Sequence, residues 1–130
     1  MNSITCTDIE SERKNKYLVD HLKDEDFFDV AKFPEAEIEI IGSKKISDKD
    51  FEMQANMTIK GRTNEITFNS EIQTTGNSKT TGNSFTAIAR IVIDRTLWGV
   101  EYKSANVFKN LGDKLIYDDM EFDIFLISEK

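Results

Sequence analysis

The sequence has very little of several residues on which common kinds of site depend. Its 130 residues include one cysteine, one histidine, one proline and one tryptophan. Because Cys6 is the single cysteine, an intrachain disulfide and a cysteine-rich zinc site are both excluded. Because His21 is the single histidine, any histidine-dependent acid–base or nucleophilic scheme would have to use it. The sequence therefore argues against most familiar catalytic centres.

Long apolar runs and an excess of positive charge are also missing. No apolar run approaches membrane-spanning length, and the first twenty residues are too polar for a signal peptide. We therefore expect no membrane span and, unless a leader has been removed, a cytoplasmic chain. The formal net charge is −7, whereas affinity for nucleic acid depends on clustered lysine and arginine. Nucleic acid is not an expected partner.

The composition and the spacing of apolar residues favour one soluble β domain. Hydrophobic residues make up 38% and charged residues 32% of the chain, and residues 1–130 suffice for a single domain with its own core. Apolar and polar residues alternate with the period of a strand in six segments, namely 3–7, 36–40, 51–59, 66–72, 85–93 and 120–127. We predict a mostly antiparallel β barrel or sandwich.

One helix is predicted near the start of the chain. Thr7 and Glu10 have the spacing of a capping box, and the helix is expected to continue to about Asp24. Leu18 and Leu22 lie one helical turn apart, which gives the helix a thin apolar stripe. We expect a helix that lies at the surface of the domain.

The polar motifs favour structural roles over chemistry. We expect His21 to orient the end of the helix through a hydrogen bond. The acidic residues that follow it lack the pattern of a calcium loop and predict a solvated edge, comprising Asp24, Glu25, Asp26 and Asp29. The repeated Thr-Gly-Asn-Ser sequence within residues 75–84 is typical of a hairpin tip. We therefore expect no enzyme activity, no metal site and no cofactor.

Large apolar side chains are unusually frequent on the predicted strands. The chain has nine phenylalanines and four methionines, and Phe51, Met53, Met57 and Ile59 share one face of a strand with the small residue Ala55. Such a face fits a plain packed core. Flexible side chains mixed with alanines also fit a barrel with a tunnel for a chain-like ligand. The pattern by itself leaves both interpretations open.

A set of motifs spread over nearly the whole chain resembles one protein family. These motifs occur in the order His21-Leu22, Asp26–Pro34, Met57–Gly61, Ile93–Val100, Leu111–Asp113 and Asp118–Phe122. They are similar to those of the YceI-like family of polyisoprenoid-binding proteins. The resemblance implies a lipocalin-like antiparallel barrel that holds an isoprenoid chain, such as that of a quinone or polyprenyl lipid, as a carrier or store. It also implies no enzyme activity and often a homodimer.

With this resemblance, a ligand site can be predicted from the apolar face. The expected lining consists of Phe51, Met53, Met57, Ile59, Phe68, Phe85, Ile91 and Trp98. Arg95 is the candidate for contact with a polar head group, and a buried salt bridge to an aspartate of residues 26–29 is the alternative role for it. All the other predicted contacts are van der Waals contacts.

The sequence departs from the family pattern at its start. Members of the family are usually periplasmic or secreted and begin with a secretion signal and a pair of opening strands, neither of which we recognise here. We therefore expect a truncated or open barrel. Because an open sheet exposes apolar side chains at its edges, we expect a homodimer. The alternative function is a protein-interaction module whose core is filled by its own side chains.

Overall fold

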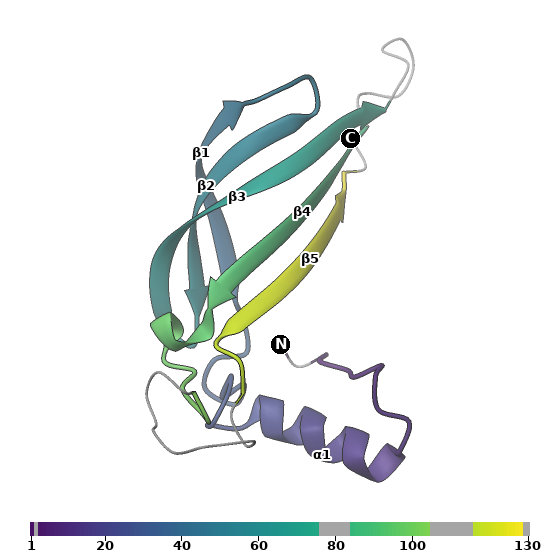
Figure 1. Cartoon of the computed structure of the whole chain (residues 1–130), viewed down its shortest axis with the longest axis vertical. Coiled ribbons are helices and arrows are strands. Elements are labelled where there is room, and N and C mark those ends of the chain that lie inside the picture. Colours follow the sequence, from purple (N-terminus) through teal and green to yellow (C-terminus); the bar gives the residue numbers. More distant parts are fainter. Residues whose placement is uncertain (2, 76–83, 105–115, 129–130) are drawn as a thin grey trace. The chain divides into compact units, whose positions relative to one another are not determined.

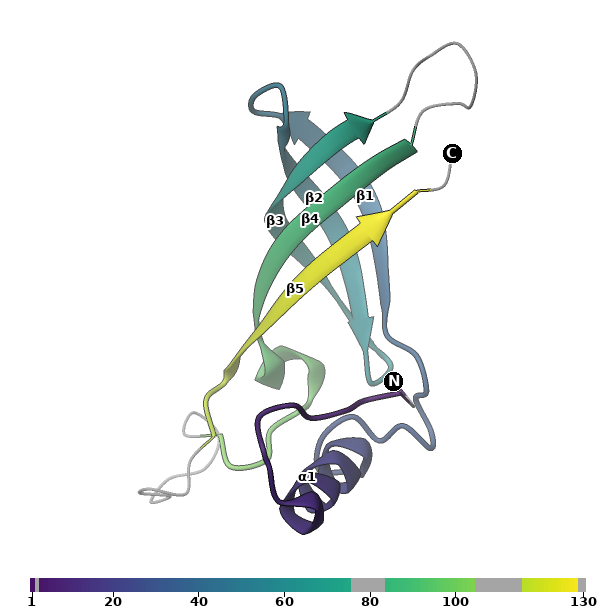
Figure 2. The ribbon, with the colours of Figure 1, turned by 90° about the vertical axis from the view of Figure 1, so that its right-hand side faces the viewer.

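A computed structural model of the chain describes residues 1, 3–75, 84–104 and 116–128. In these residues, helix α1 (Glu12–Lys23) precedes five strands, which are β1 (Glu37–Lys45), β2 (Asp50–Ile59), β3 (Arg62–Thr75), β4 (Ser84–Asp94) and β5 (Asp119–Ile127). A short 3₁₀ helix, η1 (Arg95–Trp98), follows β4 and is green in Figure 2. The predicted mostly β fold with one helix near the start is confirmed.

The strands form one antiparallel sheet in the order of the sequence. Each strand lies beside its neighbour in the chain, from β1 to β5 (Figure 1). Within the described residues β1 and β5 are the two ends of this order, so the sheet is not closed. The barrel predicted from the sequence is therefore present in its open form.

The turn between β2 and β3 shows how the local sequence sets this topology. Lys60 and Gly61 have φ angles of 52° and 74°, the left-handed pair that a two-residue hairpin turn requires. A Cβ atom at Gly61 would lie 2.8 Å from Cε1 of Phe33, so the position needs glycine for space as well as for conformation. The turn predicted at residues 60–64 is therefore shorter than expected, because β3 already begins at Arg62.

The chain divides into two compact units. The first comprises Met1–Ile38, Met57–Asn64 and Asp94–Asp119, and we call it the capped unit. The second comprises Glu39–Asn56, Glu65–Ile93 and Met120–Lys130, and we call it the sheet unit. Strands β2 and β3 contribute residues to both units. Each unit is described separately below.

In the sheet unit, strand pairing determines which side chains share a face. Strands β3 and β4 pair with Ser70 opposite Ala89 and Ile72 opposite Ala87. Ser70 and Ala89 are both buried, as is Ile91, whereas Ile88 and Val92 on the other face of β4 are exposed. The odd-numbered face of β4 is therefore the inner face of the sheet, as the alternation predicted.

In the capped unit, the most deeply buried side chains lie in the segment after β4, and the helix contributes none. Helix α1 contains no buried residue, which agrees with the predicted surface helix. Arg95, Trp98, Val100 and Ser104 are instead among the most buried side chains of the chain. Asp94 caps η1, because its Oδ1 accepts hydrogen bonds from the amide and the hydroxyl of Thr96 at 3.0 and 2.6 Å.

Two predictions for the first residues are wrong. Residues 3–7 form no strand, and α1 begins at Glu12 with Ser11 at its N-cap position and no side-chain capping bond. The physical reason is the side chain of Asn15, whose Nδ2 donates to the carbonyl oxygens of Cys6 and Ile9 at 2.7 and 3.1 Å. These bonds hold the segment against the helix that follows it.

The remaining strand predictions agree with the structure. Strands β1, β2, β3, β4 and β5 include the segments predicted at 36–40 (from Glu37), 51–59, 66–72, 85–93 and 120–127. Most of the repeated Thr-Gly-Asn-Ser sequence, residues 76–83, lies outside the described residues. Within the described part of the chain, no helix has the length and apolar character needed to cross a membrane.

Candidate functional site

The inner face of the sheet unit brings several of the predicted lining residues together. Phe51 and Met53 lie on the same face of β2 as the fully buried Ala55. The hydroxyls of Thr58 and Thr63 bond across the hairpin at 2.7 Å, so even positions of β2 share a face with odd positions of β3. The odd positions of β2 therefore share the inner face with the even positions of β3.

The strand register extends this inner face to the other predicted residues of the sheet unit. Phe68 is two positions from Ser70 on β3, and Ser70 pairs with Ala89 on β4. Phe85 and Ile91 are odd-numbered, like Ala89, and lie on the same side of β4. Phe51, Met53 and Phe68 are half-buried and Phe85 is 42% exposed, whereas Ile91 is buried. This unit thus presents large apolar side chains that its own packing covers incompletely.

The predicted lining residues of the capped unit are in a different environment. Met57 and Ile59 at the end of β2 are 4% and 3% exposed, and Trp98 is 1% exposed. The indole Nε1 of Trp98 donates a hydrogen bond to the carbonyl oxygen of Met57 at 2.9 Å. These three side chains are parts of a packed core, with the polar atom of the indole satisfied.

Arg95 occupies the centre of the capped unit. Its side chain is 2% exposed, and its guanidinium donates hydrogen bonds of 2.8–3.1 Å to four backbone carbonyls, those of Val100, Tyr102, Ile116 and Tyr117. An N–H group of a buried arginine that is already bonded in this way has little capacity for a ligand. The geometry therefore gives Arg95 the role of ordering the segments around it.

The ion pair of Arg95 differs from the alternative that the sequence suggested. Nη2 lies 3.8 Å from Oδ1 of Asp118, whereas Asp26 and Asp29 approach His21 and Lys32. The predicted salt bridge to residues 26–29 is thus replaced by one to Asp118. Burial lowers the pKa of Arg95, and the nearby carboxylates of Asp118 and Asp94 oppose this effect. Asp118 comes from just before β5, a proximity that no local sequence pattern predicts.

His21 makes the kind of hydrogen bond that the sequence predicted. Its Nε2 lies 3.0 Å from Oδ2 of Asp26 and 3.9 Å from Oδ2 of Asp24. Asp24 also accepts a hydrogen bond from the amide of Asp26 at 2.9 Å. His21 and the acidic residues after it were expected to have separate roles, but the turn at the end of α1 brings His21, Asp24 and Asp26 together. The occurrence of one histidine and two aspartates within six residues is the sequence feature from which this cluster could have been predicted.

The comparison with known families decides the identity of the fold. The model of the YceI-like domain matches residues 1–126. The chain belongs to the YceI-like family. The resemblance inferred from the sequence motifs is confirmed. No curated protein sequence matches the chain.

Solved structures of YceI-like proteins share this fold. The Campylobacter jejuni YceI protein is 19% identical, with a TM-score of 0.72 over 93% of this chain. A mutant of that protein with a monobromobimane guest gives a TM-score of 0.73 over 90% of this chain at the same 19% identity. Burkholderia cenocepacia BcnA is 18% identical, with a TM-score of 0.71 over 87% of this chain. The match covers 64% of each of these three chains. At such identities the likeness shows the fold alone.

Proposed function

We propose that this YceI-like chain binds a long apolar ligand, namely an isoprenoid chain such as that of a quinone or polyprenyl lipid, and acts as its carrier or store. Membership of a family known for binding apolar ligands, whose members are generally not enzymes, supports the proposal. The main observation in support of the proposal is that the apolar side chains on the inner face of the sheet unit are incompletely buried. There Phe51, Met53 and Phe68 are only partly buried and Phe85 is exposed.

The physical chemistry of this face suits a hydrocarbon chain. Burying apolar surface contributes about 0.8 kcal/mol per methylene group, so a long chain gains affinity without directional contacts. Met53 adapts its shape to an irregular apolar partner, and aromatic rings such as those of Phe51 and Phe68 offer large contact areas. The proposed contacts are therefore the incompletely buried residues of the sheet unit, namely Phe51, Met53, Phe68 and Phe85. Met57, Ile59, Ile91 and Trp98, also predicted as lining, would support them from the packed core.

The decisive experiment examines the purified protein for lipid. We expect mass spectrometry of an organic extract to show an isoprenoid-type lipid, or the delipidated protein to take up quinones with side chains of several lengths. Tryptophan fluorescence can follow uptake, because Trp98 is the single tryptophan. A lipid-free extract, together with no uptake of any quinone tested, would overturn the proposal.

A second candidate function is a protein-interaction module that assembles as a homodimer. It is favoured by exposed apolar side chains on the outer face of the sheet unit, where Ile88 and Val92 of β4 and Phe125 and Ile127 of β5 are 49–65% exposed. A stable interface of this kind should bury at least about 1,000 Å². Light scattering at micromolar concentration tests the dimer, and a mass of 14.9 kDa would identify a monomer.

A further inference from the structure

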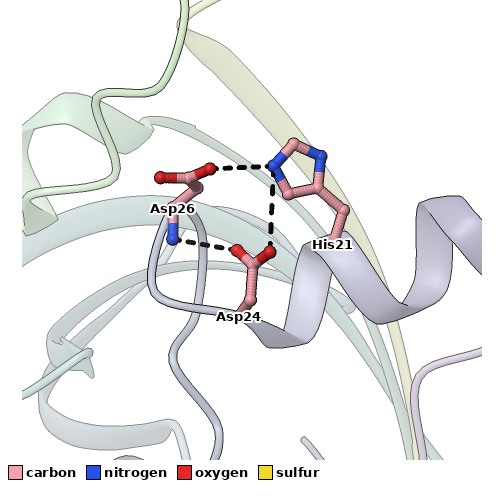
Figure 3. A group of neighbouring side chains, drawn as sticks. All are labelled: His21, Asp24 and Asp26. Carbon is pink, nitrogen blue, oxygen red and sulfur yellow. Dashed lines mark hydrogen bonds and ion pairs between the residues drawn. The ribbon is translucent and has the colours of Figure 1, made fainter.

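Three potential metal-binding atoms converge where α1 ends. They are Nε2 of His21 and one carboxylate oxygen each of Asp24 and Asp26, and all three lie within 4.8 Å of one another (Figure 3). Around a zinc ion with bonds of 2.0–2.1 Å, neighbouring ligand atoms are separated by roughly 3.3 Å. The separations of 3.0 and 3.9 Å from Nε2 to the two aspartates bracket this value. Small rotations of two exposed carboxylates would complete the geometry.

The imidazole distinguishes this group from an ordinary acidic surface. The His21 side chain is 17% exposed and lies among three aromatic rings, with centroid distances of 4.8 Å to Tyr102, 5.1 Å to Phe27 and 5.9 Å to Tyr17. The contacts with Tyr102 and Phe27 are edge-to-face, which restricts the orientation of the ring. Nε2 is thus aimed at the two carboxylates before any ion binds.

One of the carboxylates is also held in place. Oδ1 of Asp24 accepts the hydrogen bond from the amide of Asp26, while Oδ2 of Asp24 is the atom nearer to Nε2 of His21 (Figure 3). This bond ties the two aspartates together and limits the side-chain entropy that an ion would have to overcome. The three ligands therefore come from one short and internally bonded segment.

The group faces a surface hollow with room for an ion and its water. The hollow has a volume of about 390 Å³ and is lined by Tyr17, Asp20, His21, Asp24, Asp26 and Tyr102. The lining contains three carboxylates and no lysine or arginine. Three lysines near this lining make other contacts: Lys16 pairs with Asp20, Lys103 lies 5.3 Å from the centre of the Tyr102 ring, and Nζ of Lys60 donates to the carbonyl oxygen of Glu25 at 2.7 Å. The three carboxylates of the lining favour a cation over an anion.

We propose that His21, Asp24 and Asp26 bind a divalent transition-metal ion, with Zn²⁺ as the best match. Imidazole nitrogen selects Zn²⁺ and its neighbours over Mg²⁺ and Ca²⁺, which prefer all-oxygen sites. Three protein ligands leave a fourth position for water from the hollow. For Nε2 to bind the ion, neutral His21 must carry its proton on Nδ1. This site is separate from the proposed lipid-binding face and does not depend on it.

The test uses ZnCl₂ with the full chain in a Cys6→Ser background, which removes the competing thiol. We expect saturable one-to-one binding by calorimetry. Because the chain has one histidine, its ring nitrogens give the only imidazole signals in ¹⁵N NMR, and zinc should move the Nε2 signal and fix the Nδ1–H tautomer. Asp24→Asn and Asp26→Asn should each weaken binding by at least about tenfold, since each removes a charged ligand.

Asp29→Asn is the matched control. It removes the same charge from the same segment, and its backbone φ of 47° is one that asparagine tolerates. Its zinc affinity should stay within about twofold of that of the parent, because Asp29 faces Lys32. The proposal is overturned if zinc leaves the imidazole signals unchanged. Equal affinity of the Asp24→Asn, Asp26→Asn and Asp29→Asn variants, or binding that saturates with Ca²⁺ but not Zn²⁺, would overturn it as well.

Discussion

The two halves of strand β2 have the same pattern and different surroundings. Phe51 and Met53, in the sheet unit, are only partly buried, whereas Met57 and Ile59, in the capped unit, are almost completely buried. All four lie on one face of the strand, and a methionine occurs in each half. Alternation therefore determines which face is apolar, while the segments packed against that face determine whether it becomes core or surface.

The polar interactions of the two units also differ in burial: those of Arg95 and Trp98 in the capped unit are buried, and that of Arg90 in the sheet unit is exposed. In the capped unit, Arg95 and Trp98 bury their donor groups and direct them to backbone carbonyls. In the sheet unit, Arg90 and Asp123 form an exposed pair of 2.8 Å between β4 and β5. Buried bonds of the first kind are costly to break, because the partner left behind is desolvated, and exposed pairs contribute little. The capped unit should therefore dominate the stability of the chain.

The largest effect is expected from Trp98→Ala. Removing this fully buried side chain leaves a cavity and deletes the indole hydrogen bond to the Met57 carbonyl, and should lower the free energy of unfolding by about 3–5 kcal/mol. Denaturant unfolding followed by circular dichroism measures the loss. The corresponding change in the sheet unit, Phe51→Ala, should cost less, because Phe51 is only partly buried. If Trp98→Ala and Phe51→Ala lowered the free energy of unfolding equally, the proposed difference in packing between the two units would be wrong.

A methionine-to-tryptophan exchange on each half of β2 sharpens the comparison. Met57→Trp should destabilise the chain by about 1–3 kcal/mol through overpacking, since Met57 is 4% exposed. Met53→Trp should change stability by less than about 1 kcal/mol, because its side chain is only partly buried. Met53→Trp should nevertheless weaken quinone uptake if that face binds the ligand. Thermal melts and quinone titrations on the same samples separate the effects on stability and binding.

Sequence reasoning predicted the strands well because each strand carries its own alternation. The segment from Phe51 to Ile59 and that from Phe85 to Ile93 are long and regular, and both became strands. The strand predicted at residues 3–7 failed because five alternating residues are too few to outweigh the bonds that Asn15 makes to that segment. Local pattern is a strong predictor when it persists and a weak one when a single side chain can override it.

The candidate sites were predicted less completely, because burial and long-range partners are properties of the fold. Arg95 was recognised as important, but its partners lie 5 to 22 residues further along the chain. Met57 and Met53 looked equivalent in the sequence, and only packing distinguishes them. The His21 cluster could be found from its spacing, since its three members lie within one helix end. A binding site formed by residues of one turn can be predicted from their spacing in the sequence, whereas a site formed by residues of several strands cannot.

The smallest expected effect concerns the exposed pair in the sheet unit. The hydrogen bond and charge of Arg90 lower the pKa of Asp123 from its ordinary value of 3.8. Because the pKa is lower in the folded chain, the pair stabilises the fold above the ordinary pKa, and this stabilisation is lost as the pH falls through the folded value. The stability difference between the parent and Asp123→Asn should therefore be constant near neutral pH and shrink below about pH 4.

Salt provides the control for this last prediction. Both side chains are largely exposed, at 67% for Arg90 and 72% for Asp123, so the difference should be small and should shrink further in 1 M NaCl. Urea unfolding at a series of pH values, with and without salt, measures it. A difference that grew towards low pH would reverse the sign expected from the pKa. A difference as large as that of Trp98→Ala would show that the sheet unit is held by polar contacts as strongly as the capped unit.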